Sequence, residues 1–389
     1  MYIYILAMLI TLIFMLFAME YKRVYKKMYK LNKYNEKEDT LYCQSKKHTL
    51  MLKKLKATKR KFYIFATLSA IPLFVVGAIR YDVGTDYMYT YYPNFIKILN
   101  GENAYTEIGF VYLNKFIQLF THNATWLFVI TSALFVGVLF KCIYDYSKNP
   151  IISLAVVFFA CIYFFSLNNV RQAISAVIML ASYKHIRKNN FTEFLIYDLI
   201  ACIFHYSSLL LIPVYIFINW KFVKKHFLSI AIVLTVGLGF IAKILLIIIS
   251  NTKYSYFIES SFNNGQTTTI NIIYGFFVLV LAFVVLYKDR KKDKSAWVLL
   301  CMQFFYFLVS YLSIFIPISE MISRIAFFFL IYNVLLIPYL CYKIKINTNR
   351  YCLLLTYFGV YFMYFYYYIV MKGYYQVLPY KTIFFNIGW

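Results

Sequence analysis

Twelve apolar segments divide this chain of 389 residues, and their number and length restrict it to a membrane protein with many spans. A spanning helix needs about 20 apolar residues, although shorter ones occur inside a packed bundle. The segments cover residues 2–19, 62–79, 124–144, 151–167, 170–186, 194–204, 207–219, 227–250, 270–287, 296–316, 324–341 and 351–370. We therefore predict an all-α integral membrane protein, a single domain over 1–389 with about 11 to 12 transmembrane segments.

The composition excludes an ordinary soluble domain. Hydrophobic residues make up 62% and charged residues 14% of the chain, whereas soluble domains have roughly 45–50% and 25%. Much of the net charge of +25 lies in residues 20–61 and in short loops between the apolar segments, which indicates membrane topology rather than a nucleic-acid partner. Segment 2–19 lacks a basic start and a small-residue cleavage site, so we expect a retained helix.

The distribution of Lys and Arg orients the spans. Residues 20–61 carry fifteen Lys and Arg against four Asp and Glu, and 288–294 has the sequence Lys-Asp-Arg-Lys-Lys-Asp-Lys. Residues 80–123 have three basic and four acidic residues. Since short basic loops stay in the cytoplasm, we expect 20–61 to be a basic cytoplasmic loop resting on anionic headgroups. We expect 80–123 to be an outer loop with amphipathic helices.

Residues 194–219 determine on which side of the membrane the later loops lie. Basic clusters flank this stretch at both ends, so both ends should lie in the cytoplasm. We therefore predict a hairpin of two short helices that meets at His205 on the outside. A single long helix would place 288–294 outside, against the charge bias. The amino terminus and the tail after residue 370 are then also outside.

The cysteines give no sign of a disulfide framework or a metal site. The seven lie mostly within or at the ends of apolar segments, with no CxxC pair and no His/Cys cluster at zinc spacing. We expect no structural disulfide, no metal site and no cofactor.

Three of the eight arginines fall on the predicted outer face, where basic residues are scarce: Arg80, Arg171 and Arg324. Arg171 and Arg324 begin outer helix ends, where a cation opposes the helix macrodipole. An interfacial snorkelling arginine is the simple explanation. We favour anion binding, because the guanidinium fork suits bidentate contact with phosphate and a helix start offers free amides.

A second concentration of polar residues follows the second apolar segment, at 80–92. Gly84 permits a tight turn there, and Thr85 or Asp86 can cap a helix that continues to residue 99. Tyr87 and its neighbours would give that helix an aromatic face for a hydroxyl-rich ligand. The alternative is an interfacial tyrosine belt anchored by an arginine.

His205 lies at the predicted break between two short helices, beside Ser207. A lone histidine in an apolar stretch is more often a satisfied core residue, but irregular backbone at membrane depth is expected mainly around cavities or packed protein. Asp198, seven residues earlier, either orients the imidazole or is a neutralised core carboxylate.

Five motifs, in this order, resemble the EpsG-like family of Wzy-type polysaccharide polymerases: Arg80-Tyr-Asp-Val-Gly-Thr-Asp-Tyr87, Glu107-Ile-Gly-Phe-Val-Tyr-Leu-Asn114, Asn169-Val-Arg-Gln-Ala-Ile174, Phe204-His-Tyr-Ser-Ser208 and Ser323-Arg-Ile325. The resemblance implies a metal-independent glycosyltransferase. It would polymerise undecaprenyl-diphosphate-linked oligosaccharide repeat units into capsule, exopolysaccharide or O-antigen, on the outer leaflet of a bacterial inner membrane.

The chemistry that the resemblance implies assigns roles to the motif residues. Arg171 and Arg324 would stabilise the diphosphate leaving group, and His205, Glu107 or Asp86 would take the proton of the attacking hydroxyl. Substrate binding would involve Arg80, Asp82, Tyr87, Asn114, Asn169, Gln172 and Ser207. Membrane lipids and, in the cell, flippase and chain-length regulator proteins would be its partners.

Two other functions remain open from the sequence. A flippase of the lipid-linked unit would also bind diphosphate with arginines, but it would need polar groups along an inward path. A membrane O-acyltransferase would place its histidine toward the cytoplasm, opposite to the predicted place of His205.

Overall fold

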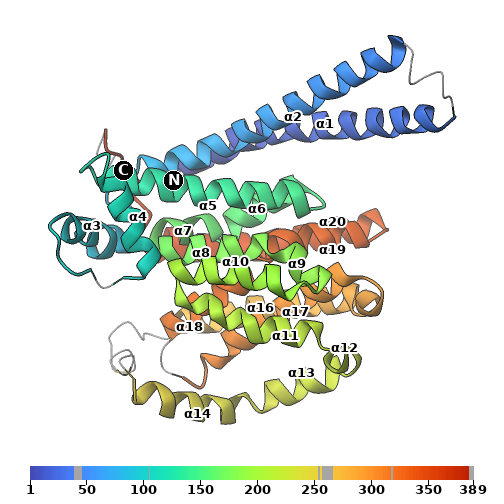
Figure 1. Cartoon of the computed structure of the whole chain (residues 1–389). Helices are drawn as coiled ribbons and strands as arrows, with labels where there is room; N and C mark the ends of the chain where they lie inside the picture. The colour runs from blue at the N-terminus through green and yellow to red at the C-terminus, as the bar shows by residue number, and fades with distance from the viewer. Residues whose placement is uncertain (39–45, 105, 253–254, 256–265, 317–318, 385–389) are drawn as a thin grey trace.

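The computed structural model describes residues 1–38, 46–104, 106–252, 255, 266–316 and 319–384. Within these ranges the chain is helical, apart from turns and one isolated backbone bridge between Arg80 and Thr382. The predicted all-α membrane bundle is therefore confirmed. The helices that form the bundle lie mostly along one direction (Figure 1). They are α1 (Tyr2–Glu38), α2 (Lys46–Ala78), α5 (Thr125–Tyr146), α6 (Pro150–Phe159), α7 (Ile162–Asn168), α8 (Val170–Ala181), α10 (Phe191–Phe204), α11 (Leu211–Asn219), α13 (Phe227–Val236), α14 (Leu238–Ser250), α16 (Gln266–Leu286), α17 (Lys294–Leu312), α18 (Ser319–Leu330), α19 (Asn333–Lys343) and α20 (Asn347–Phe365).

Short helices lie at the two ends of the bundle. One end carries a π-helix, α3 (Tyr92–Leu99) and α4 (Ile108–Gln118), and the chain's amino terminus lies near them at the left of Figure 1. The other end carries α9 (Tyr183–Lys188) and α12 (Lys221–Lys225). The remaining short elements are η2 (Tyr87–Tyr91, the π-helix), η3 (Tyr206–Leu210), η4 (Lys288–Lys291), η5 (Tyr366–Met371) and η6 (Tyr374–Gln376).

The number of helices able to cross a membrane is smaller than predicted. Among the described residues, six helices are long and apolar enough by themselves, and up to nine spans result if each of three bent pairs counts as one. The bends lie between α6 and α7 (52°), α13 and α14 (55°), and α18 and α19 (42°). The predicted segments 170–186, 194–204 and 207–219 do form helices, but these fall short of the same criterion because the chain breaks at Ser182 and His205.

Residues 20–61 differ from the predicted loop. α1 continues to Glu38 and α2 begins at Lys46, so most of this basic stretch is helical. The two helices lie side by side and extend past the rest of the bundle at the end away from α3 and α4 (Figure 1). Lysine has a good helix propensity, so a lysine-rich stretch can be helical, and most of the basic side chains here are exposed. We call this part of α1 and α2 the basic hairpin. Its cytoplasmic location remains a prediction.

The C-terminal segment closes over the loop that follows α2. Lys381 C=O accepts a hydrogen bond from Tyr81 N–H at 3.0 Å, and Gln376 C=O accepts one from Gly84 N–H at 3.0 Å. The Tyr380 hydroxyl donates to Val76 C=O at 2.7 Å. These contacts hold residues 79–84 at the end of the bundle that carries α3 and α4.

Candidate functional site

Glu107 precedes the first turn of α4 and is held against α10 by a glycine. The residue has an extended backbone (φ −65°, ψ 148°), which ends the preceding loop and begins the helix. Two positions later, a Cβ at Gly109 would lie only 2.1 Å from Ile203 Cγ2 and 2.7 Å from Ile203 C=O. Only glycine permits so close an approach of α4 to α10. The end of α10, and with it His205, therefore lies beside Glu107.

Arg171 lies in the first turn of α8, as predicted. The anion beside its guanidinium is a carboxylate of the protein itself, that of Glu107. Arg171 Nη1 forms an ion pair with Glu107 Oε2 and donates to Thr106 Oγ1 at 2.7 Å. Its guanidinium carbon lies 5.9 Å from the centre of the Phe110 ring. The cation that opposes the macrodipole of α8 is thus compensated by Glu107, whose carboxylate lies favourably at the start of α4.

His205 ends α10 and is oriented by the same carboxylate. Its backbone is extended (φ −160°, ψ 116°), which breaks the helix before η3. Its Nδ1 lies 2.7 Å from Glu107 Oε1. Because an ionised carboxylate only accepts hydrogen bonds, Nδ1 carries the proton in this pair. The Nε2 atom of a neutral His205 therefore keeps its lone pair for another proton.

Glu107 is consequently the centre of a His205–Glu107–Arg171 cluster. Its side chain is 8% exposed, compared with 21% for Arg171 and 24% for His205. Burial alone raises the pKa of the Glu107 carboxyl, but the hydrogen bond from His205 and the charge of Arg171 together outweigh it. The pKa therefore lies below its ordinary value, and Glu107 is ionised at neutral pH.

Tyr91 connects this cluster to two more of the predicted residues. Burial raises the pKa of its hydroxyl to about 12, the charge of Asp86 also raises it, and the charges of Arg171 and Arg324 lower it. Arg171 and the Val170 backbone at the start of α8 also act on the pKa of this hydroxyl. Asp86 and Arg324 therefore lie within electrostatic reach of one phenol beside Arg171.

Arg324 reaches the cluster from α18. Gln172 Nε2 donates to Arg324 C=O, and the Phe328 ring, one turn further along α18, lies parallel to the His205 ring at 6.4 Å. Residues four apart share one face of a helix, so Arg324 and Phe328 both face this end of α8 and α10. However, α18 begins at Ser319, so Arg324 lies in its second turn rather than at the helix start that we predicted.

The loop before η2 places Asp86 next to the junction of α7 and α8. Gly84 has φ +96°, and a Cβ there would lie 2.7 Å from Leu167 C=O. Asp86 N–H donates to Asn168 Oδ1 at 2.9 Å. The turn and the helix start were predicted correctly, but no side-chain hydrogen bond caps this helix at Asp86. The loop is instead tied to the end of α7.

Arg80 and Tyr87, both predicted to bind substrate, are buried in this structure. Arg80 is 2% exposed, and its guanidinium carbon lies 4.9 Å from the centre of the Phe128 ring. Tyr87 is also 2% exposed, and its ring stacks on the ring of Phe128, with the two ring centres 4.1 Å apart. Both side chains are part of the packing between residues 80–91 and α5. The exposed aromatic side chains of this segment are Tyr81, Tyr89 and Tyr92.

Asp82 and Asp198 lie apart from the His205–Glu107–Arg171 contacts. Asp82 forms an ion pair with Lys381, with Oδ2 and Nζ 2.7 Å apart. Asp198 is fully buried, and the partner of the His205 ring is Glu107 rather than Asp198. Of the two alternatives for Asp198, the structure therefore favours a buried core carboxylate over a residue that orients the imidazole.

The remaining predicted binding residues lie on the elements that carry the cluster, or directly beside them in the chain. Asn114, Asn169 and Gln172 are buried, whereas Ser207 is partly exposed two positions after His205. One polar atom of each amide has no hydrogen-bond partner among the described residues: Asn114 Oδ1, Asn169 Nδ2 and Gln172 Oε1. Such atoms are costly in a buried place unless something pairs with them.

Sequence reasoning missed Thr106 and the C-terminal Lys381. Thr106 donates to Glu107 Oε2 at 3.3 Å and accepts from Arg171, so it positions both members of the ion pair. The available signal was that Thr106 directly precedes the motif that begins at Glu107. Lys381 lies 299 residues from its partner Asp82, and no local pattern indicates that pairing.

Among the described residues there is no group of three or more His, Cys, Asp or Glu side chains arranged to hold a metal ion. The family comparison matches the EpsG family model over residues 63–382. No curated protein and no solved structure matches the chain. The match contains every residue of the cluster but begins after most of the basic hairpin.

Proposed function

Because the chain belongs to the EpsG family, whose members are Wzy-type polymerases, we propose that it is a membrane glycosyltransferase that lengthens a polysaccharide. Its donor would be a growing chain on undecaprenyl diphosphate, and its acceptor a sugar hydroxyl of the next lipid-linked repeat unit. We place the reaction on the outer leaflet of a bacterial inner membrane. A flippase would supply the repeat units, and chain-length regulators would act on the product, which would be capsule, exopolysaccharide or O-antigen.

The observation that carries the proposal is the contact of one carboxylate, Glu107, with both His205 and Arg171. The reaction needs a base for a weakly acidic hydroxyl and positive charge for a departing diphosphate. His205 has the geometry for the first, because Glu107 fixes its Nδ1 proton and leaves Nε2 free to accept another. Arg171 and Arg324, both close to Tyr91, suit the second.

The proposed step is a displacement at the anomeric carbon of the donor sugar. The acceptor oxygen forms the new glycosidic bond as its proton moves to His205 Nε2. The bond from the anomeric carbon to the diphosphate oxygen breaks, and the lipid diphosphate leaves with that electron pair. Glu107 then stabilises the imidazolium, and the forked guanidinium groups stabilise the added charge on phosphate. No oxidant, reductant or water is consumed.

Asp86, Asn114, Asn169, Gln172 and Ser207 are the remaining candidates for sugar contacts in this proposal. Support comes from the unpaired amide atoms of the three buried amides, because a hydroxyl-rich substrate offers both donors and acceptors.

The test is to incubate purified protein in liposomes with a lipid-linked oligosaccharide and to separate the products by size. A polymerase gives a ladder of longer chains on the lipid. A flippase moves the unit across the bilayer without changing its mass, and an acyltransferase adds acetyl mass in the presence of an acyl donor. Movement or acylation without a ladder would replace the proposed function with one of these alternatives.

A further inference from the structure

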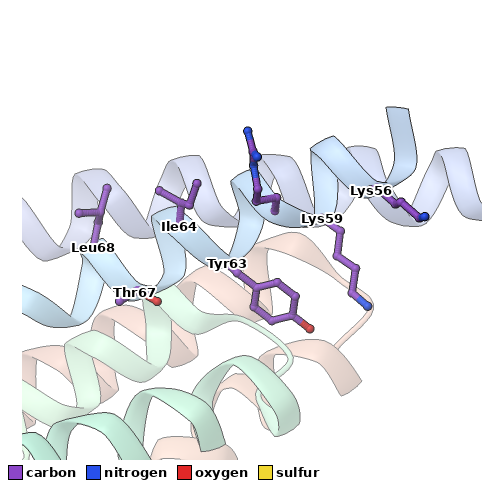
Figure 2. A pocket seen from close by; sticks show the side chains of 7 residues that line it. Lys56, Lys59, Tyr63, Ile64, Thr67 and Leu68 are labelled. Carbon is purple, nitrogen blue, oxygen red and sulfur yellow. The ribbon is translucent and has the colours of Figure 1, made fainter. Parts of the chain in front are cut away.

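One face of α2 carries a groove in which basic residues are followed by apolar ones. The groove has a volume of about 610 Å³ and is lined by Lys56, Lys59, Arg60, Tyr63, Ile64, Thr67 and Leu68. These positions recur at the spacing of three and four that keeps side chains on one helix face. Along the axis of α2 in Figure 2, Lys56 and Lys59 lie nearer the projecting end of the helix, and Thr67 and Leu68 lie nearer its other end.

The length of α2 places the change from basic to apolar side chains at a membrane boundary. α2 has 33 residues and is therefore about 50 Å long, whereas the hydrocarbon core is about 30 Å thick. If Ala78 lies at one boundary, about 20 residues cross the core, and the other boundary falls near Lys59. Lys56, Lys59 and Arg60 would then lie at headgroup level. Ile64 and Leu68 would lie in the hydrocarbon.

Charge complementarity defines the ligand. Lys56, Lys59 and Arg60 are exposed, and none of the seven lining residues is acidic. The Lys59 ammonium lies 5.9 Å from the centre of the Tyr63 ring, and tyrosine is a residue that favours the interface. A water-soluble acidic partner could meet the three cations but could not reach Ile64 and Leu68 within the membrane. A phospholipid meets both.

We infer that this groove binds an anionic phospholipid of its own leaflet, with the phosphate against Lys56, Lys59 and Arg60 and an acyl chain along Ile64 and Leu68. The three basic residues precede the region that matches the family, 63–382. The headgroup half of the site therefore lies outside the matched region. The inference does not depend on the proposed polymerase reaction.

The test is native mass spectrometry of the full chain in a neutral detergent, titrated with phosphatidylglycerol or with phosphatidylcholine of the same acyl chains. Because each basic residue near an anionic headgroup contributes roughly a fivefold gain in affinity, we expect phosphatidylglycerol to bind at least about tenfold more tightly. The triple variant Lys56→Gln/Lys59→Gln/Arg60→Gln should lose this preference.

The matched control is Lys30→Gln/Lys33→Gln/Lys37→Gln, which removes three exposed charges from α1 and should keep the preference. Equal binding of the two lipids by the parent, or equal losses in the two triple variants, would overturn the inference. So would displacement of bound phosphatidylglycerol by an equal concentration of glycerol phosphate, which would indicate a site for free phosphate. If the first triple variant does not fold, the single variants Lys59→Glu and Lys33→Glu are compared instead. Lys59→Glu should weaken the preference for phosphatidylglycerol, and Lys33→Glu should keep it.

Discussion

His205 Nδ1 lies 2.7 Å from Glu107 Oε1, although 98 residues separate the two in the chain. The contact exists because Gly109 lets α4 touch α10 and because α10 ends at His205. Glu107 also pairs with Arg171, so a single carboxylate sets the orientation of the proposed base and compensates a proposed phosphate ligand. Substitutions at these positions should therefore have separable effects.

Replacement of His205 by glutamine should reduce polymerisation by about 10²–10⁴-fold, since glutamine keeps a polar side chain but cannot accept the proton. The measurement is the initial rate of ladder formation at equal amounts of folded protein. His122→Gln is the control, because His122 is exposed in the same outer region and should leave the rate unchanged. A His205→Gln variant with the parent rate would remove His205 from the mechanism and direct attention to Asp86.

Replacement of Glu107 by glutamine should change the dependence of stability on pH. The folded pKa of Glu107 is lowered, so its ionised form contributes stability above the unfolded pKa of about 4.3. This contribution disappears as pH falls through the lower folded pKa. The apparent Tm of the parent should therefore exceed that of Glu107→Gln at neutral pH, and the difference should shrink in acid. Glu102→Gln, at an exposed site, should show no such difference.

Lysine in place of Arg171 or Arg324 should lower the polymerisation rate at least about tenfold, because lysine keeps the charge but loses the planar fork. The exposed Arg23→Lys change on α1 serves as the control. Parent rates in both Arg171→Lys and Arg324→Lys would leave these residues only an anchoring role.

Alanine at Gly109 should separate Glu107 from His205. Its Cβ would lie 2.1 Å from Ile203 Cγ2 and 2.7 Å from Ile203 C=O, so α4 must move away from α10. We expect a lower Tm and a large loss of activity. The control is Gly137→Ala on α5, where a Cβ meets nothing within 4 Å and where alanine should be neutral or stabilise by about 0.5–1 kcal/mol. Equal activity in the two variants would argue against the close packing of α4 and α10 as a requirement.

Labelling of intact cells tests which end of the bundle is outside. A cysteine at Asn123, in the outer loop, should react with a membrane-impermeant maleimide, whereas one at Lys291, in the basic loop before α17, should not. Both positions are exposed. The seven native cysteines are first replaced by serine. The opposite labelling pattern would invert the topology.

The hydrophobic pattern by itself determined that the chain is an all-α membrane protein and where most of its helices lie. The reason is that lipid requires every spanning segment to be apolar and to satisfy its own backbone hydrogen bonds, and both requirements are local. The turn at Gly84, the helix break at His205 and the position of Arg171 in a first turn were likewise predictable, because each depends on neighbouring residues.

Only the tertiary structure decided which polar residues meet. The sequence suggested that Arg171 needs an anion, but only the fold brings Glu107, 64 residues away in the chain, to its guanidinium. Arg80 and Tyr87 resembled surface residues, and packing against Phe128 buried them. Such pairings depend on how helices far apart in the chain pack together, and the spacing of residues along the chain carries no information about that packing. Spans and turns, in contrast, depend on residues that are neighbours in the sequence.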